Sequence, residues 1–99
     1  MRLPSDQAIK LKQLLTDELG SDCELLLFGS RADDRARGGD VDLLARAVRP
    51  VPHKVLTAVR LAARAERLLG GRRVDLLLID PDTELQPIHR IALSHGVPL

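Results

Sequence analysis

Residues 29–46 read GSRADDRARGGDVDLLAR, and this stretch decides how the rest of the chain is interpreted. Its final part, DVDLLAR at residues 40–46, is predicted to form a strand that contains Asp40 and Asp42. Side chains on a strand alternate between its faces, so Asp40 and Asp42 point the same way, about 7 Å apart, and Val41 points oppositely. Two carboxylates on one face repel each other at neutral pH, and a bound cation would offset that repulsion.

The beginning of the stretch, Gly29-Ser30, directly follows CELLLF at residues 23–28, a second predicted strand. Where a chain leaves a strand and starts a helix, free backbone N–H groups and the helix dipole favour a phosphate. Gly29 allows close approach of the backbone, and the Ser30 hydroxyl adds a donor. Each feature alone has a plainer interpretation: Gly-Ser as an ordinary strand–helix turn, and D-x-D as a strand start with two solvent-facing acids.

A third acid lies in VDLLLI at residues 74–79, a predicted strand that is otherwise uniformly apolar. Asp75 is a costly residue in such a segment unless a cation or partner compensates its charge. If this strand lies beside residues 40–46, Asp75 points at the same site as Asp40 and Asp42. The alternative is an exposed acid at a frayed strand end.

The remaining patterns predict an α/β protein of the α+β, two-layer type, with helices on a mixed sheet of three to four strands. The order is α-β-α-β-α-β-α, including a short helix after Gly29-Ser30, and the terminal VPL is a candidate edge strand. Apolar residues at helical spacing predict helices over residues 5–19, 53–69 and 87–95. The expected core-facing stripes are Ala8, Leu11, Leu15 and Leu19; Val55, Ala58, Leu61, Ala62, Ala65, Leu68 and Leu69; and Ile88, Ile91, Ala92 and His95.

Composition excludes several classes of protein. The 99 residues favour one domain, residues 1–99, and 44% hydrophobic content favours a globular fold. A net charge of +1 and a single aromatic, Phe28, give no basis for expecting a nucleic-acid partner. One cysteine, Cys23, excludes an intramolecular disulfide, and neither a secretory signal nor a membrane-spanning run is present. We therefore expect a cytoplasmic protein without membrane association.

Together, G-S-R-A, D-V-D-L and the later V-D-L-L resemble the DNA polymerase β-type nucleotidyltransferase superfamily. The short chain is similar to its minimal nucleotidyltransferase branch, the MntA-type antitoxins. The family pattern places nine residues between Gly-Ser and D-x-D, and here residues 31–39 are nine residues. The resemblance covers nearly the whole chain, because the order of helices and strands also agrees, and it implies the polymerase β-like nucleotidyltransferase fold.

The resemblance implies a division of labour among these residues. Gly29 and Ser30 would hold the β- and γ-phosphates of ATP, and Asp40 and Asp42 would ligate two Mg²⁺ ions. Asp75 would ligate the catalytic metal and help to activate an acceptor hydroxyl, which attacks the α-phosphorus while pyrophosphate leaves. Arg31 follows Ser30 and is the best further candidate for a phosphate contact.

The resemblance also implies a partner: a HEPN-type toxin that receives AMP on a Tyr hydroxyl, which makes this chain an AMPylating antitoxin. A different class of function is a binding module that neutralises its partner by occlusion, with a vestigial nucleotide site. A third is a detached catalytic domain acting on a small molecule such as an aminoglycoside. The nucleotide base, the number of nucleotides transferred and a homo- or hetero-oligomeric state stay open at this point.

Two departures from the family pattern affect nucleotide choice and rate rather than reaction class. Many members continue G-S-R-A-R-G, whereas here Asp33 and Asp34 come before Arg35, and Gly39 replaces a common Ser. Arg35 and Arg37 could close over the nucleotide or belong to a solvated loop. We interpret the remaining residues plainly: a solvated face for Arg60, Arg64 and Arg67, a core position for Cys23, and no role for His53, His89 and His95.

Overall fold

The computed structural model describes residues 3–28 and 40–99 of the chain. Within these ranges, its elements are α1 (Ser5–Leu19), β1 (Glu24–Phe28), β2 (Val41–Arg46), α2 (Lys54–Leu68), β3 (Val74–Ile79), α3 (Pro87–His95) and β4 (Val97–Pro98). The predicted helices and strands outside residues 29–39 are confirmed to within one residue at each end, and the VPL segment does supply an edge strand. The short helix expected after Gly29-Ser30 lies outside the described residues.

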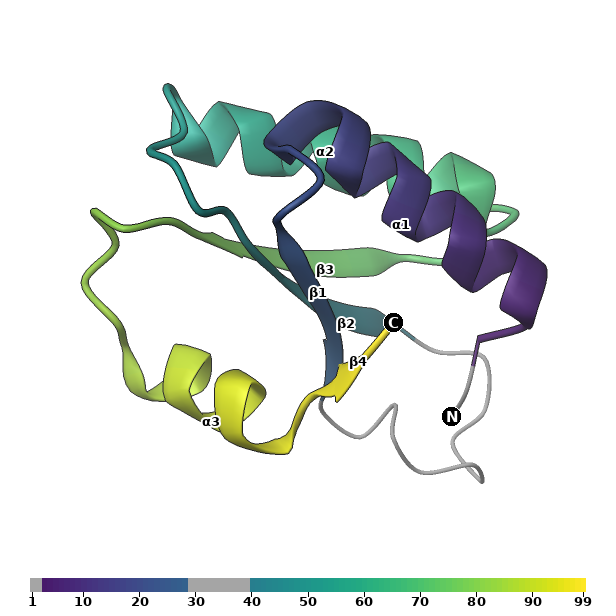
Figure 1. Ribbon diagram of the computed structural model, residues 1–99. Helices are drawn as coiled ribbons and strands as arrows, with labels where there is room; N and C mark the ends of the chain where they lie inside the picture. The colour runs from purple at the N-terminus through teal and green to yellow at the C-terminus, as the bar shows by residue number, and fades with distance from the viewer. Residues whose placement is uncertain (1–2, 29–39) are drawn as a thin grey trace.

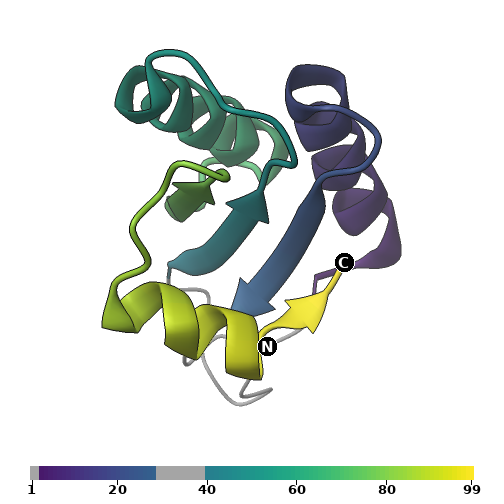
Figure 2. The same ribbon diagram turned by 60° about the vertical axis from the view of Figure 1, so that its left-hand side comes forward.

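The four strands form one mixed sheet in the order β3-β2-β1-β4. Strand β1 runs antiparallel to both of its neighbours, whereas β2 and β3 run parallel and are connected through α2. Helices α1 and α2 lie together against one face of the sheet, and α3 lies on the opposite side (Figures 1 and 2). The predicted α+β fold with a mixed sheet is confirmed.

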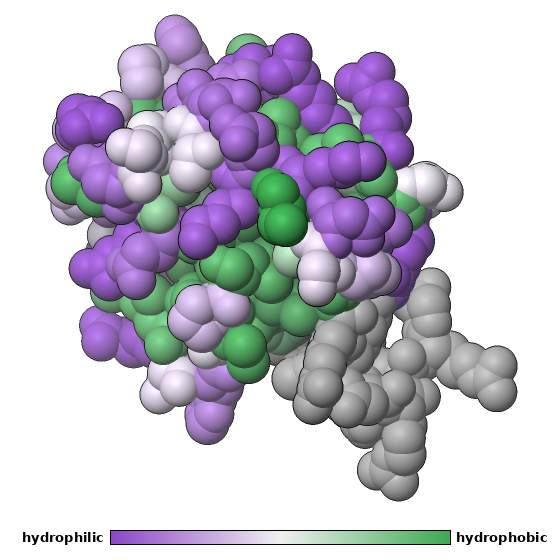
Figure 3. All heavy atoms as spheres, turned by 45° about the vertical axis from the view of Figure 1, so that its right-hand side comes forward, coloured by the Kyte–Doolittle hydropathy of each residue, from purple (hydrophilic) through white to green (hydrophobic). Residues whose placement is uncertain are grey.

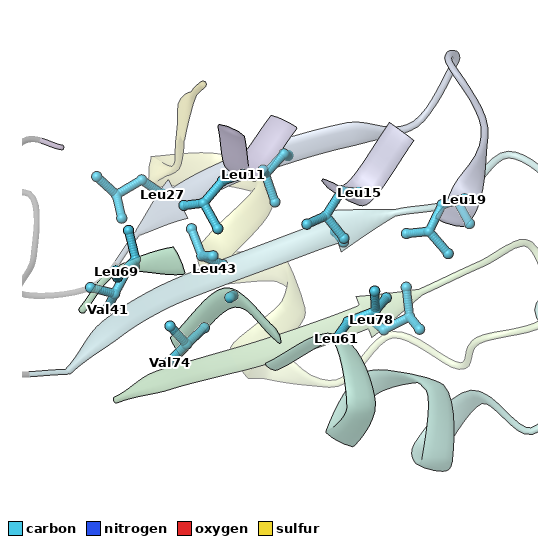
Figure 4. Close-up of a cluster of buried hydrophobic side chains, with 14 residues drawn as sticks. Leu11, Leu15, Leu19, Leu27, Val41, Leu43, Leu61, Leu69, Val74 and Leu78 are labelled. Carbon is cyan, nitrogen blue, oxygen red and sulfur yellow. The ribbon is translucent and has the colours of Figure 1, made fainter. Parts of the chain in front are cut away.

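The main core lies between the sheet and the pair α1 and α2 (Figure 4). Leu11, Leu15 and Leu19 of α1 are buried at a spacing of four residues, as the sequence predicts. Strand β1 is buried on both faces, because Leu25 and Leu27 join this core while Leu26 and Phe28 join a smaller cluster beneath α3. That two-sided burial explains why β1 is a continuous apolar run.

The predicted stripe of α2 is wrong at its first member, Val55, and at Leu68, which is 37% exposed. Leu61 is fully buried, but Val55 is 80% exposed. A helix turns by about 100° per residue, so the first-turn residue on the same side as Leu61 is Lys54, seven positions earlier. Lys54 Nζ contacts Asp80 Oδ1 at 2.9 Å at the end of β3, and this ion pair stands where an apolar contact was expected.

The predicted stripe of α3 is only partly correct. Ala92 is fully buried, whereas Ile88 and Ile91 are 46% and 52% exposed and His95 is exposed too. The small Ala92 side chain permits close packing of α3 on the sheet, and just past the helix a Cβ placed on Gly96 would lie 2.8 Å from Leu26 Cβ. Close approach along this narrow strip leaves the two isoleucines on the outer side of the helix.

The surface of the molecule is divided unevenly between polar and apolar side chains. In Figure 3 hydrophilic side chains dominate the upper part of the face shown, and apolar surface gathers lower down. No helix among residues 3–28 and 40–99 combines the length and apolar character that crossing a membrane requires.

Candidate active site

Parallel pairing of β2 and β3 brings the two strand aspartates together. In the register of this pair, Asp42 stands opposite Asp75. Both neighbours of Asp42, Val41 and Leu43, are fully buried in the core beneath α1 and α2. By alternation, Asp42 and Asp75 therefore point to the other face of the sheet, the face that carries α3. The interpretation of Asp75 depended on the third strand lying beside the second, and the two strands do lie side by side.

Asp40 lies one residue before β2 rather than inside it. Its side chain is 41% exposed, and that of Asp75 is 48% exposed. Asp42 is half-buried. The three carboxylates thus lie at the solvent-accessible end of the sheet where β2 and β3 begin, accessible to a ligand from outside.

Strand β1, which precedes the predicted phosphate-binding residues in the sequence, ends at this same end of the sheet. Strand β1 ends at Phe28, whose register partner on β2 is Asp42. Gly29, Ser30 and Arg31 come next in the sequence and lie outside the described residues. The same holds for Asp33, Asp34, Arg35, Arg37 and Gly39.

Arg73, which the sequence analysis did not single out, contacts two of the carboxylates. Its Nε lies 3.5 Å from Asp75 Oδ1 and 3.9 Å from Asp40 Oδ2. The backbone of Arg73 is tied to the start of β2, because Val41 N donates a hydrogen bond to Arg73 O at 2.8 Å. A basic residue two positions before a strand aspartate was the signal available in the sequence, but its target became visible only through strand pairing.

The donor chemistry at this end suits Mg²⁺, which prefers oxygen ligands and is commonly held by one or two carboxylates together with substrate phosphates. Among residues 3–28 and 40–99, however, no three His, Cys, Asp or Glu side chains are arranged to hold one metal ion. The described carboxylates therefore fit a metal shared with substrate oxygens better than a site built from protein ligands alone.

A second polar cluster lies at the opposite end of the sheet, around Asp80. Its carboxylate accepts hydrogen bonds from Lys54 Nζ and Val51 N, each at 2.9 Å, and from Thr83 Oγ1 at 3.0 Å. The hydrogen bond from Lys54, followed by that from Val51, holds the pKa of Asp80 well below its ordinary value. These bonds join the end of β3 to the start of α2, so we assign the cluster a structural role.

A cleft of about 480 Å³ opens at this Asp80 end. Its lining includes Arg46, Val48, Asp80, Thr83 and Leu93, and none of its lining residues is a predicted site residue. The cleft is therefore separate from the carboxylates, which occupy the other end of the strands.

The other residues considered in the sequence mainly make contacts that hold the fold together. Arg60 and Arg64 of α2 both contact Glu18 Oε1 on α1, at 3.0 and 2.9 Å, and so join the two helices. His89, expected to have no role, accepts a hydrogen bond from Gln86 N at 3.0 Å through Nδ1 and caps α3. Cys23 is half-buried against the main core, and burial raises the pKa of its thiol.

Comparison with known proteins gives a fold relationship. The crystal structure of a toxin–antitoxin with AMP-PNP is similar to this chain with a TM-score of 0.72, over 97% of this chain and 72% of that chain. The sequence identity is 23%, so the likeness shows a common fold. No protein-family model and no curated protein sequence matches the chain. The molecule is therefore an α+β protein that shares its fold with a chain of a toxin–antitoxin structure.

Proposed function

We propose that this chain is a magnesium-dependent nucleotidyltransferase that transfers AMP from ATP to a hydroxyl of a partner protein, as the antitoxin of a toxin–antitoxin pair. The observation that carries the proposal is the placement of Asp75 opposite Asp42 in the parallel register of β2 and β3. Two carboxylates from separate strands on one open face are the donors that a metal-assisted phosphoryl-type displacement needs.

Two further observations support the proposal. Gly29-Ser30 precedes Asp40 by the spacing seen in the nucleotidyltransferase pattern, and Phe28, the residue before that segment, is the register partner of Asp42. The structurally similar toxin–antitoxin was crystallised with AMP-PNP, an analogue of ATP. By that analogy, the acceptor is a toxin partner. In its most specific form, the proposal is that a Tyr hydroxyl of a HEPN-type toxin accepts the AMP.

In the proposed reaction, the hydroxyl oxygen bonds to the α-phosphorus as the bond to the departing pyrophosphate breaks. Bound Mg²⁺ would supply charge stabilisation for the attacking and leaving oxygens. Asp40 and Asp42 would ligate two Mg²⁺ ions, and Asp75 would ligate the catalytic one and help to draw the proton from the acceptor hydroxyl. Gly29, Ser30 and Arg31 would orient the phosphates.

The test is a transfer assay with two positions of the label. The purified chain is incubated with Mg²⁺, the protein encoded beside it, and ATP labelled in either the α- or the γ-phosphate. We expect the α-label on the partner protein and no γ-label. Transfer of the γ-label would indicate a kinase, and stable binding of the two proteins without any transfer would overturn the enzymatic proposal.

A non-catalytic antitoxin that acts by occlusion is the second candidate. The arrangement around Arg73 favours it, because Arg73 contacts the Asp40 and Asp75 carboxylates and no three described acids converge on a metal position. The double variant Asp40→Asn, Asp42→Asn separates the two functions. Full protection of cells by this variant against the toxin would establish occlusion, and loss of protection with retained binding would establish catalysis.

A further inference from the structure

Arg73 stands out among the charged residues of the described chain because it contacts two candidate metal ligands from two different segments. Its Nε lies 3.5 Å from Asp75 Oδ1 on β3 and 3.9 Å from Asp40 Oδ2 just before β2. The Arg46–Glu24 pair at the other end of β2 joins one acid to one base at 3.6 Å. Arg73 thus bridges two of the three carboxylates.

The position of Arg73 follows from the backbone. Arg73 directly precedes β3, and its carbonyl accepts the hydrogen bond from Val41 N at 2.8 Å. Its Cα is therefore held at the entrance of both parallel strands, while its side chain, 71% exposed, is free to change rotamer. Because the backbone of Arg73 is fixed and its guanidinium is solvated, the guanidinium can contact the carboxylates or move away without disturbing the sheet.

The chemistry of the guanidinium makes these contacts consequential. Arginine stays protonated at any physiological pH, so its charge cannot be removed by proton loss. A divalent cation placed between the same carboxylates would meet a positive charge only a few ångströms away, and Coulomb repulsion at such distances is substantial even under partial solvent screening. The guanidinium and the divalent cation therefore exclude each other from this position.

We propose that Arg73 is an internal competitor of the divalent cation: its guanidinium and the metal bind the Asp40 and Asp75 carboxylates alternately. The inference rests on the proposed metal-dependent function and adds a regulating residue to it. Arg73 is a positioning residue. It balances the negative charge of the carboxylates when no metal is bound, and it sets the metal concentration at which the metal replaces the guanidinium.

The test measures metal binding directly, with Mn²⁺ as the probe and its electron paramagnetic resonance signal as the readout. Wild type, Arg73→Gln and Arg73→Lys are titrated at one low, fixed ionic strength. Arg46→Gln is the matched control, since it removes an exposed, ion-paired arginine from the far end of the same sheet. We expect about threefold to fivefold tighter Mn²⁺ binding for Arg73→Gln, the scale of an exposed charge interaction, and wild-type affinity for Arg46→Gln.

Thermal unfolding supplies a second readout that a purely structural arginine would not reproduce. Arg73→Gln is expected to have a lower melting temperature than wild type without metal and a larger rise on adding Mn²⁺. Arg73→Lys, which keeps the charge, should remain close to wild type in both measurements. Agreement of both readouts supports competition.

The outcomes separate this inference from the proposed function. Wild-type Mn²⁺ binding with unchanged or weaker binding by Arg73→Gln overturns the competition and leaves the metal-dependent function standing. Failure of wild type and Arg73→Gln alike to bind Mn²⁺, with AMP-PNP present as well as without it, overturns both. Tighter binding by Arg46→Gln to the same degree also overturns it, because the effect would then reflect net charge rather than position.

Discussion

At the scale of single residues, the aspartates near the two ends of the parallel strands differ in their surroundings. Asp42 and Asp75 are register partners on β2 and β3 and point to the same face of the sheet, and Arg73 contacts Asp75 and Asp40. Asp80, at the other end of β3, is almost fully buried and surrounded by donors. Carboxylates that a ligand can reach are suited to one that brings positive charge, whereas an acid satisfied by buried donors is suited to holding a fold together.

The first residue-scale prediction concerns Asp75. Asp75→Asn removes a metal-binding charge but keeps the shape of the side chain, so we expect transfer of the α-label to fall by about 100-fold or more. Because the side chain is 48% exposed, the melting temperature should stay near that of wild type. Glu84→Gln, an exposed acid in the loop before α3, is the control for loss of one negative charge. Equal transfer rates for Asp75→Asn and wild type would remove Asp75 from the reaction.

The second concerns the pH dependence of stability through Asp80. Its pKa is lowered on folding from an ordinary value of 3.8, so the carboxylate stabilises the folded protein fully above about pH 4. As the pH falls below that value, the unfolded chain takes up a proton first and this stabilisation is progressively lost. Asp80→Asn should therefore be less stable than wild type at pH 7, with a shallower decline in acid.

Denaturant unfolding measured from pH 7 to pH 3 checks this prediction. Asp82→Asn is the matched control, because Asp82 is an exposed neighbour whose backbone N–H, not its side chain, contacts Asp80. Parallel stability curves for Asp80→Asn and wild type would show that the Asp80 hydrogen bonds do not couple proton binding to folding.

At the scale of elements, α2 and α3 meet the sheet along narrower strips than their apolar patterns suggest. Helix α2 packs through Leu61 and Ala65, and α3 packs through Ala92. Val55 and Ile91 carry large apolar side chains yet remain exposed. Helical periodicity defines which residues share a side, but the position and tilt of the helix on the sheet decide how much of that side is covered.

The element-scale prediction uses a pair of truncations on α2. Leu61→Ala empties a fully buried position and should cost about 2–5 kcal/mol of unfolding free energy. Val55→Ala removes a side chain that is 80% exposed and should change stability by no more than about 0.5 kcal/mol. Urea unfolding measures both. A large loss for Val55→Ala would place the first turn of α2 in the core, contrary to the structure.

At the scale of the whole molecule, the sheet separates two polar ends. One end gathers the candidate catalytic acids at the start of the parallel pair, and the other gathers the Asp80 cluster and the adjacent cleft. The helices α1 and α2, joined by Arg60, Arg64 and Glu18, cover the face opposite the acids. A ligand can therefore bind to the acidic end without entering the core.

The whole-molecule prediction is stabilisation by substrate. A ligand that binds only the folded state stabilises it, by about 2.7 kcal/mol at a hundredfold excess over its Kd, which is roughly 10 °C or more for a domain of this size. Mg²⁺ with AMP-PNP should raise the melting temperature accordingly, and the variant Asp40→Asn, Asp42→Asn should show little rise. An equal rise in both proteins would place the nucleotide away from the acids.

The sequence by itself determined the helices and strands outside residues 29–39 and the spacing from Gly29-Ser30 to Asp40, because these depend on local periodicity and chain distance. Only the tertiary structure decided that Asp75 stands opposite Asp42 and that Arg73 contacts Asp40 and Asp75. It also decided that α2 presents Lys54 rather than Val55 to the Asp80 cluster. The physical reason is that strand pairing and helix placement join segments distant in the chain, and their register is selected by burial of the whole core rather than by any local pattern.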